Sequence, residues 1–270
     1  PIMEAAAQFR EKKRTSLDAQ RAALLHLAAK AWRRPLSSEE SEALRSLDPR
    51  LMLVRILASP AFLYRSERAP EQTGPVTPHE LASRLSHFLW SSAPDQTLLD
   101  LARSGALTNP ETLRAETRRM IADERIRRLA TEFGCQWLHI RDIATLSEKS
   151  ERHFPQFTQL RTSMLEESVR FISHSIQTNA PVLSLLNADH TFVDAPLAAH
   201  YGVKLNGDGW QRVDGLQSSH RGGILGLAAT LSKQSGASRT SPILRGNWVS
   251  EVLLGERLPR PPKDVPILPE

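Results

Sequence analysis

Apolar residues recur every three or four positions along most of the chain, a spacing that is typical of amphipathic helices. Prolines, glycines and capping residues separate the apolar stripes and mark where the helices begin and end, as in the capping box expected of Thr77 and Glu80. Neither half of the chain shows a long stretch of alternating apolar and polar positions. We therefore expect a mainly α protein of bundle-like modules. The predicted helices lie at or near residues 16–34, 38–47, 49–58, 78–89, 94–104, 110–121, 123–137, 160–176, 222–231 and 242–254.

Two regions depart from this helical pattern. Residues 204–215 carry the turn dipeptides Asn206-Gly207 and Asp208-Gly209 around Trp210. Such dipeptides favour tight turns between strands, so we expect a short loop-rich or hairpin insertion near residues 204–215. Residues 259–270 contain five prolines and are predicted to form an extended linker.

Two of the predicted helices have apolar faces that should be buried. In the helix over residues 123–137, Cys135 is expected to be buried, and the apolar seam consists of Ile126, Leu129, Phe133 and Trp137. In the helix over residues 222–231 nearly every side chain is apolar, so Leu225 is expected to be buried with its neighbours. Gly222 and Gly226 lie one turn apart, a spacing that permits a close helix contact.

Composition narrows the classes of function. The 270 residues carry a net charge of +5, and a basic chain can bind nucleic acid. However, the arginines of residues 118–128 alternate with acidic residues at helical spacings, as on an ion-paired, solvated helix face. We therefore expect no nucleic-acid partner. The single cysteine excludes an internal disulfide and a Cys-based zinc site, and no apolar run approaches the roughly 18 to 20 residues of a membrane span.

Several short phrases of the sequence together resemble one protein family. The phrases are Arg34-Pro35-Leu36, Ser59-Pro60-Ala61-Phe62-Leu63-Tyr64-Arg65, Phe88-Leu89-Trp90, Gln136-Trp137-Leu138, His200-Tyr201-Gly202 and Arg239-Thr240-Ser241-Pro242. They are similar to planctomycete-type exported, cytochrome c-associated multidomain proteins, in which domain of unknown function 1592 is flanked by domains 1595 and 1588. The resemblance implies helical modules over residues 16–67, 77–203 and 221–258, followed by the proline-rich linker over residues 259–270.

The resemblance also implies a redox context. Such proteins attach haem c through a CxxCH motif, which this chain lacks, so the resemblance implies no cofactor within these residues and haem c elsewhere in the parent protein. It further implies a flanking cytochrome c-type domain as partner, and a periplasmic or secreted location with the signal peptide outside this chain. The resemblance transfers no catalytic residues. Asp194 stands where we would expect asparagine.

Asp189, His190 and His200 are the candidate catalytic residues. Carboxylates beside imidazoles can carry out general acid–base chemistry, or bind a metal where their geometry converges. Sequence shows only that the three are near one another along the chain, and no metal site is predicted. The structural alternative is that Asp189 caps a turn, as aspartates often do.

Arg239, Ser241 and Arg245 form a candidate anion-binding group at the start of the helix that Pro242 opens. Free N–H groups at a helix N-terminus carry partial positive charge, and the two arginines would add to it. A haem propionate, a sugar carboxylate or a sulfate are the ligands considered. The structural alternative is that the arginines tie helix ends together through acidic side chains.

Two functions are compatible with these observations. In the first, the chain is a fragment of an exported c-type-haem-associated redox protein and forms its substrate-side or scaffolding portion, with haem-linked oxidoreductase activity in the parent protein. In the second, it is a non-catalytic cell-surface module that binds polysaccharide, another anionic ligand or a protein partner. A closed pocket that gathers Arg239, Arg245, Asp189 and His200 would favour the first function, and a shallow groove the second.

Overall fold

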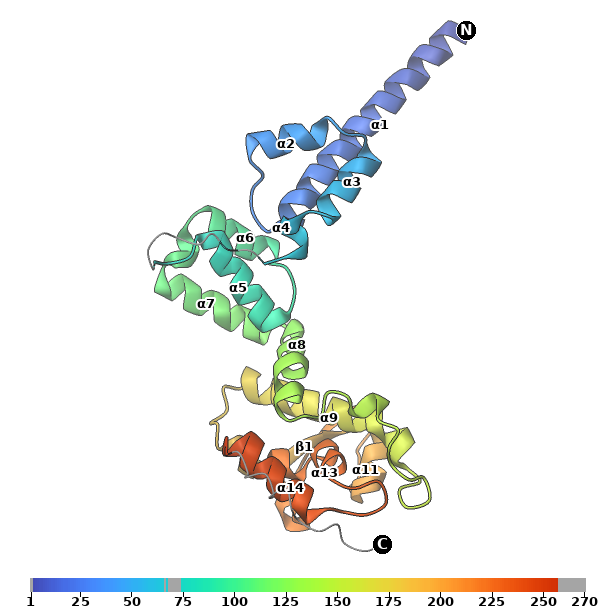
Figure 1. Ribbon diagram of the computed structural model, residues 1–270, viewed down its shortest axis with the longest axis vertical. Helices are drawn as coiled ribbons and strands as arrows, with labels where there is room; N and C mark the ends of the chain where they lie inside the picture. The colour runs from blue at the N-terminus through green and yellow to red at the C-terminus, as the bar shows by residue number, and fades with distance from the viewer. Residues whose placement is uncertain (1, 66, 68–73, 257–270) are drawn as a thin grey trace, which may run out of the picture. The chain divides into compact units, whose positions relative to one another are not determined.

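The computed structural model describes residues 2–65, 67 and 74–256 (Figure 1). The chain divides into two compact units, here called unit 1 (Pro1–Asp123) and unit 2 (Glu124–Glu270). Helices dominate both units, and one two-stranded sheet is the only sheet in the described residues. The mainly α fold class is therefore confirmed. None of the helices in the described ranges is long and apolar enough to span a bilayer.

Unit 1 is built of helices. Its elements are α1 (Ile2–Ala31), α2 (Ser38–Arg45), α3 (Pro49–Leu57), α4 (Pro60–Leu63), α5 (Pro78–Trp90), α6 (Gln96–Arg103), the 3-10 helix η1 (Ala106–Thr108) and α7 (Pro110–Ala122).

Unit 2 contains shorter helices and the sheet. Its helices are η2 (Glu124–Ile126), α8 (Arg127–Leu129), the π-helix η3 (Ala130–Cys135), η4 (Ile143–Thr145), α9 (Phe157–Gln177), α10 (Ser184–Asn187), α11 (Ala195–Tyr201), η5 (Leu216–Ser219), α12 (Gly223–Gly226), α13 (Ala228–Lys233), α14 (Pro242–Trp248) and the π-helix η6 (Val249–Leu253). The strands are β1 (His190–Val193) and β2 (Gln211–Asp214).

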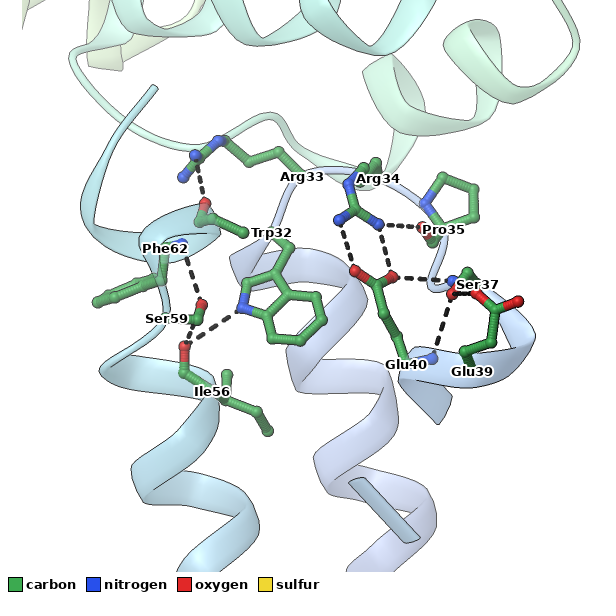
Figure 2. A network of polar contacts seen from close by, with 11 residues as sticks. Trp32, Arg33, Arg34, Pro35, Ser37, Glu39, Glu40, Ile56, Ser59 and Phe62 are labelled. Carbon is green, nitrogen blue, oxygen red and sulfur yellow. Dashed lines mark hydrogen bonds and ion pairs between the residues drawn. The ribbon is translucent and has the colours of Figure 1, made fainter. Parts of the chain in front are cut away.

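The first three helices of unit 1 share a small apolar core. α1 and α3 lie side by side (Figure 1), and the buried residues between the helices are Ala28, Trp32, Leu44, Met52 and Ile56. Trp32 follows the end of α1, and its Nε1 donates a hydrogen bond of 3.2 Å to the carbonyl of Ile56 (Figure 2). This bond fixes the end of α1 against α3 without leaving the indole N–H unpaired.

The turn between α1 and α2 is fixed by an ion pair combined with a helix cap. Arg34 donates to both carboxylate oxygens of Glu40 at 2.8 and 2.7 Å (Figure 2). The same carboxylate accepts the N–H of Ser37 at 2.9 Å, and the Ser37 hydroxyl accepts the N–H of Glu40 at 3.1 Å. The hydrogen bond from Arg34 lowers the pKa of Glu40 to about 2.

Replacing Glu40 with glutamine is expected to destabilise unit 1 by about 1 kcal/mol at pH 7, because a partly exposed, bidentate ion pair is lost. The folded-state pKa of about 2 lies below the ordinary value of 4.5, so the contribution of Glu40 is present above pH 4.5 and is lost as the pH falls toward 2. Urea unfolding at pH 7 and pH 3 should therefore show a smaller difference between the two proteins at pH 3. An equal difference at both pH values would contradict this account.

The second half of unit 1 begins at the capping box predicted from the sequence. The Thr77 hydroxyl accepts the N–H of Glu80 at 3.3 Å, and the Glu80 carboxylate accepts the N–H of Thr77 at 2.8 Å. α5 then packs on α6 and α7. Trp90 at its end is fully buried and donates to the carbonyl of Met120 at 2.9 Å.

α9 is the central helix of unit 2 and contacts α8, η3, α11, α13 and β1. Its apolar face lies in a core that also includes residues of η3, α12, α13 and α14. The buried residues of this core include Cys135, Leu138, Leu160, Met164, Phe171, Val193, Leu197, Ile224, Leu227 and Trp248. The core therefore connects segments that are far apart along the chain.

The strand in the predicted insertion does not pair within that insertion. β1 and β2 are antiparallel, with His190 opposite Asp214 and Val193 opposite Gln211. Only β2 lies in residues 204–215, whose remainder is loop. Because α11 lies between the two strands, the turn dipeptides at 206–209 sit in the loop before β2 and do not form a tight hairpin turn.

A π-helix displaces the buried seam predicted over residues 123–137. η3 continues directly from α8. A π-helix has more residues per turn than an α-helix, so its side chains point in directions that differ from those expected at 3.6 residues per turn. Phe133 is consequently 61% exposed, so the prediction that it is buried was wrong. Ile126, Leu129 and Cys135 are buried, and desolvation raises the pKa of the Cys135 thiol to about 12.

Gly222 makes the close helix contact that the glycine spacing permits, whereas Gly226 does not. A Cβ on Gly222 would lie 2.8 Å from the carbonyl oxygen of Ala188, but one on Gly226 would meet nothing closer than 3.4 Å. Leu225 is 41% exposed, so its predicted burial was also wrong. α12 is a single turn, and its short exposed side includes this leucine.

The boundary between the units falls inside the module predicted over residues 77–203. The predicted modules over residues 16–67, 77–203 and 221–258 follow family boundaries, which need not coincide with compact units, and they stay a prediction. The linker predicted over residues 259–270 lies outside the described residues.

Candidate functional site

Unit 2 contains a pocket with a volume of about 350 Å³. This volume lies at the lower end of the range of small-molecule sites, roughly 300 to 1,000 Å³. The pocket is bounded by the segment before α9, by α9 and α13, and by single residues from α11 and α14. Its lining consists of Lys149, His153, Phe154, Pro155, Gln156, Phe157, Leu160, Met164, His200, Leu231, Ser232, Ser235, Thr240 and Arg245.

Most of the lining is apolar. Phe157, Leu160 and Met164 belong to the buried core of unit 2, and Phe154 packs against that core. The Ser232 hydroxyl lies 3.7 Å from the sulfur of Met164, so α13 and α9 meet directly at this wall. Because these side chains are packed from behind, the pocket has a preformed apolar surface.

Lys149 connects two segments of the chain at one rim of the pocket. Its Nζ donates to the carbonyl of Ser235 at 2.6 Å, to the hydroxyl of Ser235 at 3.1 Å and to the carbonyl of Gly236 at 3.2 Å. The next residue, Ser150, donates its N–H to the carbonyl of Ala237 at 2.8 Å. These bonds tie the segment before α9 to the loop between α13 and α14. Desolvation lowers the pKa of Lys149.

Arg245 is the second cation of the lining. It lies on α14, is partly buried, and forms none of the ion pairs seen in the described residues. Its Nε is buried and has no hydrogen-bond partner in the described part of the chain. Arg245 is therefore a cation at the pocket wall that a negatively charged ligand could pair with.

Two histidines complete the basic lining. His153 and His200 are both exposed, and the ring of His200 lies 5.7 Å from that of Tyr201. Desolvation, followed by the charge of Arg221, lowers the pKa of His200. His200 is therefore expected to be neutral at pH 7, where it can donate or accept a hydrogen bond. The described residues of the lining include no aspartate or glutamate.

A buried carboxyl group joins the elements behind the pocket. Glu167 of α9 is fully buried, and it accepts hydrogen bonds from the Thr191 hydroxyl at 2.7 Å and from the Tyr201 hydroxyl at 2.8 and 2.9 Å. The N–H of Ala228 donates to Tyr201 at 3.0 Å and to Glu167 at 3.3 Å. Desolvation raises the pKa of Glu167 to about 7. One carboxyl group thus fixes β1, α11 and α13 to α9.

The guanidinium of Arg221 lies over one side of this network. It is 4.0 Å from the centre of the Tyr201 ring and donates to the carbonyl of Gly226 at 2.9 Å. Its positive charge favours the ionised form of Glu167, although less than burial opposes it. The network therefore positions Tyr201, and with it the neighbouring His200 at the pocket.

Asp189 and His190 lie elsewhere in unit 2. The Asp189 carboxylate accepts the N–H of Gln217 at 2.6 Å, and its backbone carbonyl accepts the N–H of Leu216 at 3.2 Å. These bonds hold the start of η5, as the turn-capping alternative describes. The ring of His190 packs 5.3 Å from that of His174 and 6.1 Å from that of Phe192. Of the three candidate catalytic residues, only His200 lines the pocket, and a catalytic role stays a prediction.

The candidate anion-binding residues are also separated. The Ser241 hydroxyl accepts the N–H of Leu244 at 3.2 Å and so caps α14. Arg239 is exposed and does not line the pocket, whereas Arg245 does. Arg245 and His200 therefore line the same pocket, whereas Ser241 caps the start of α14.

Sequence reasoning missed Lys149 and the apolar lining. Lys149 and Ser235, which meet at the rim, are 86 positions apart, and a basic residue in a loop carries no local signal of such a contact. Leu160 and Met164 are buried core positions of α9. They also line the pocket together with Arg245 and His200, a role that their helical spacing does not reveal.

The described residues include no group of three or more His, Cys, Asp or Glu side chains that could hold a metal ion.

Two regions of the chain match family models. Residues 76–203 match PSD4, a protein of unknown function (DUF1592). Residues 221–270 match PSCyt3, a protein of unknown function (DUF1588). Both regions are domains of unknown function. They confirm the domains 1592 and 1588 predicted from the sequence, whereas the flanking domain 1595 and the planctomycete and cytochrome c associations stay predictions. No curated protein and no solved structure matches the chain significantly.

Proposed function

We propose that unit 2 is a binding module for a small organic anion, which occupies the pocket beside α9, α13 and α14. The observation that carries this proposal is that Arg245 lines the pocket without an ion pair in the described residues, while the described lining has no carboxylate. An anionic ligand would supply the opposite charge.

The apolar surroundings strengthen this interaction. Charges in a pocket with low-dielectric walls are screened less by water and salt than charges on an open surface. A cation beside Phe157, Leu160 and Met164 therefore attracts an anion more strongly than an exposed arginine such as Arg239. The same walls offer contact area to the uncharged part of an organic ligand.

The resemblance suggests the wider setting of this activity. We propose that the chain forms the substrate-side or scaffolding portion of an exported c-type-haem-associated redox protein, with haem attached outside these residues and a periplasmic or secreted location. The pocket supports a substrate-holding role, because it can bind a compact molecule. A haem c spectrum of the parent protein that responds to an anion bound at Arg245 would test this setting.

Polysaccharide binding receives less support from the pocket. Sugars present hydroxyl groups on most of their surface, and a site for them needs many well-placed polar groups. Here the polar groups of Lys149, Ser232 and Ser235 already bond to the protein. A compact organic anion is therefore the ligand that the site fits better.

The proposal predicts that at least one anion among hexanoate, benzoate, phenyl phosphate and glucuronate binds the full chain at pH 7, saturably and in a 1:1 ratio. Arg245→Gln should weaken that binding at least tenfold, since a charge-assisted hydrogen bond contributes about 1.5 to 3 kcal/mol. Isothermal titration calorimetry measures both. Arg239→Gln removes an equal charge outside the pocket and should leave the affinity unchanged. Equal losses in the two variants, or no binding of any anion, would disprove the proposal.

A further inference from the structure

Resting on the proposed anion binding, we infer that the ligand is a monocarboxylate with a compact apolar body. The pocket contains one cation that is available to a ligand, and a largely apolar surface around it. These two features restrict the ligand class further than a general preference for anions does.

The charged donors that a ligand can use are those of Arg245. Lys149 has three N–H donors, and three protein oxygens accept them within 3.2 Å. Its hydrogen-bonding capacity is thus used by the loop of Ser235 and Gly236. Desolvation lowers the pKa of His200 and so favours its neutral form, while His153 is exposed to water.

A single available guanidinium fits a single negative charge. Arginine presents a planar fork of donors, which matches the two oxygens of a carboxylate. A phosphate dianion is strongly hydrated, and in this pocket the donors of Lys149 are already bonded to the protein and cannot replace that water. Lost hydration that is not replaced is costly, so the pocket should prefer a carboxylate to inorganic phosphate.

The remainder of the pocket selects the body of the ligand. Phe154, Phe157, Leu160, Met164 and Leu231 line it, and the volume of about 350 Å³ admits only a compact group. Hydroxyl groups of a sugar acid would lose water against these side chains without gaining partners. A short alkyl chain or a single aromatic ring would instead be buried favourably.

The test compares matched probes on the full chain by isothermal titration calorimetry at pH 7. Hexanoate and benzoate are expected to bind at least tenfold more tightly than hexanamide and benzamide, which have the same bodies without the charge. They should also bind at least tenfold more tightly than inorganic phosphate and than glucuronate, a carboxylate with a polar body.

Two variants connect these preferences to residues. Arg245→Lys keeps the charge but loses the fork, and it should reduce the preference for benzoate over phosphate at least fivefold. Leu231→Asn should reduce the preference for benzoate over glucuronate at least fivefold. Thermal unfolding confirms that each variant is folded, and the amides serve as ligands whose binding does not use the charge.

The outcomes separate the inference from the proposed function. Tighter binding of phosphate or glucuronate than of benzoate, with a loss in Arg245→Gln, would overturn the monocarboxylate and leave anion binding intact. Equal binding of benzoate and benzamide would overturn both, because the charge would then not be recognised. Binding of none of the probes would likewise overturn both.

Discussion

Gly223→Ala is expected to destabilise unit 2 by about 3 kcal/mol or more. Gly223 has a φ of +52°, a backbone conformation that residues with a Cβ rarely adopt. The new Cβ would lie 2.4 Å from the carbonyl oxygens of both Leu185 and Leu186, which is far inside van der Waals contact. These atoms belong to the backbone of α10, so a rotamer change cannot relieve the clash. Thermal and urea unfolding of the full chain should show the loss.

Gly246→Ala is the matched control for this substitution. Gly246 lies in α14, and a Cβ there would meet no atom within 4 Å. Alanine should therefore raise the stability by about 0.5 to 1 kcal/mol, because glycine costs that much in a helix. If Gly223→Ala loses less than about 1 kcal/mol, the close packing of α12 on α10 is wrong.

The second large effect is a dependence of stability on pH that arises from Glu167. Its folded-state pKa of about 7 lies above the ordinary value of 4.5, so the folded state holds the proton more tightly than the unfolded state. The stabilisation is complete below pH 4.5 and is lost as the pH rises to 7. At about 1.4 kcal/mol for each pKa unit, the total change is about 3 kcal/mol.

Comparison with Glu167→Gln isolates this contribution. Glutamine is similar in size and cannot ionise, so the stability of the wild type relative to the variant should fall by about 3 kcal/mol between pH 4.5 and pH 7.5. The comparison is needed because His174, His190 and His200, whose pKa values are lowered, act in the opposite direction below pH 6.5. Urea unfolding at several pH values provides the measurement.

Glu166→Gln is the control for the substitution of the buried Glu167. Glu166 is the neighbouring carboxyl group, and it pairs with Arg127 at 2.7 Å and with Arg170 at 2.6 Å. The stability of Glu166→Gln relative to Glu167→Gln should still fall between pH 4.5 and pH 7.5, as that of the wild type does. A constant stability difference between the wild type and Glu167→Gln would show that this carboxyl group does not change its protonation in that range.

Helix positions could be predicted from sequence because their signals are local. The capping box at Thr77 depends on residues three positions apart, and it is present as predicted. The same reasoning failed at Phe133, because a π-helix changes the residue spacing without a distinctive sequence signal. It failed again at the sheet, where β2 pairs with a strand on the far side of α11 rather than with a neighbour.

The pocket could be predicted only in part. Arg245 and His200 were both named as candidates for one pocket, but Arg239 and Asp189, which were named with them, do not line it. Asp189 is adjacent to His190 in sequence, yet it caps a turn and stays away from the pocket. Proximity along the chain was therefore a poor guide to which residues line the pocket. Tertiary packing determines this lining, since the segments that form the pocket meet only after unit 2 has folded.

The pocket also has a consequence for how the two matched regions depend on each other. Met164 and His200 belong to residues 76–203, whereas Leu231 and Arg245 belong to residues 221–270. Each region alone would have only part of this lining and only part of the apolar core around α9. A polypeptide that contained one region without the other would therefore lack the recess.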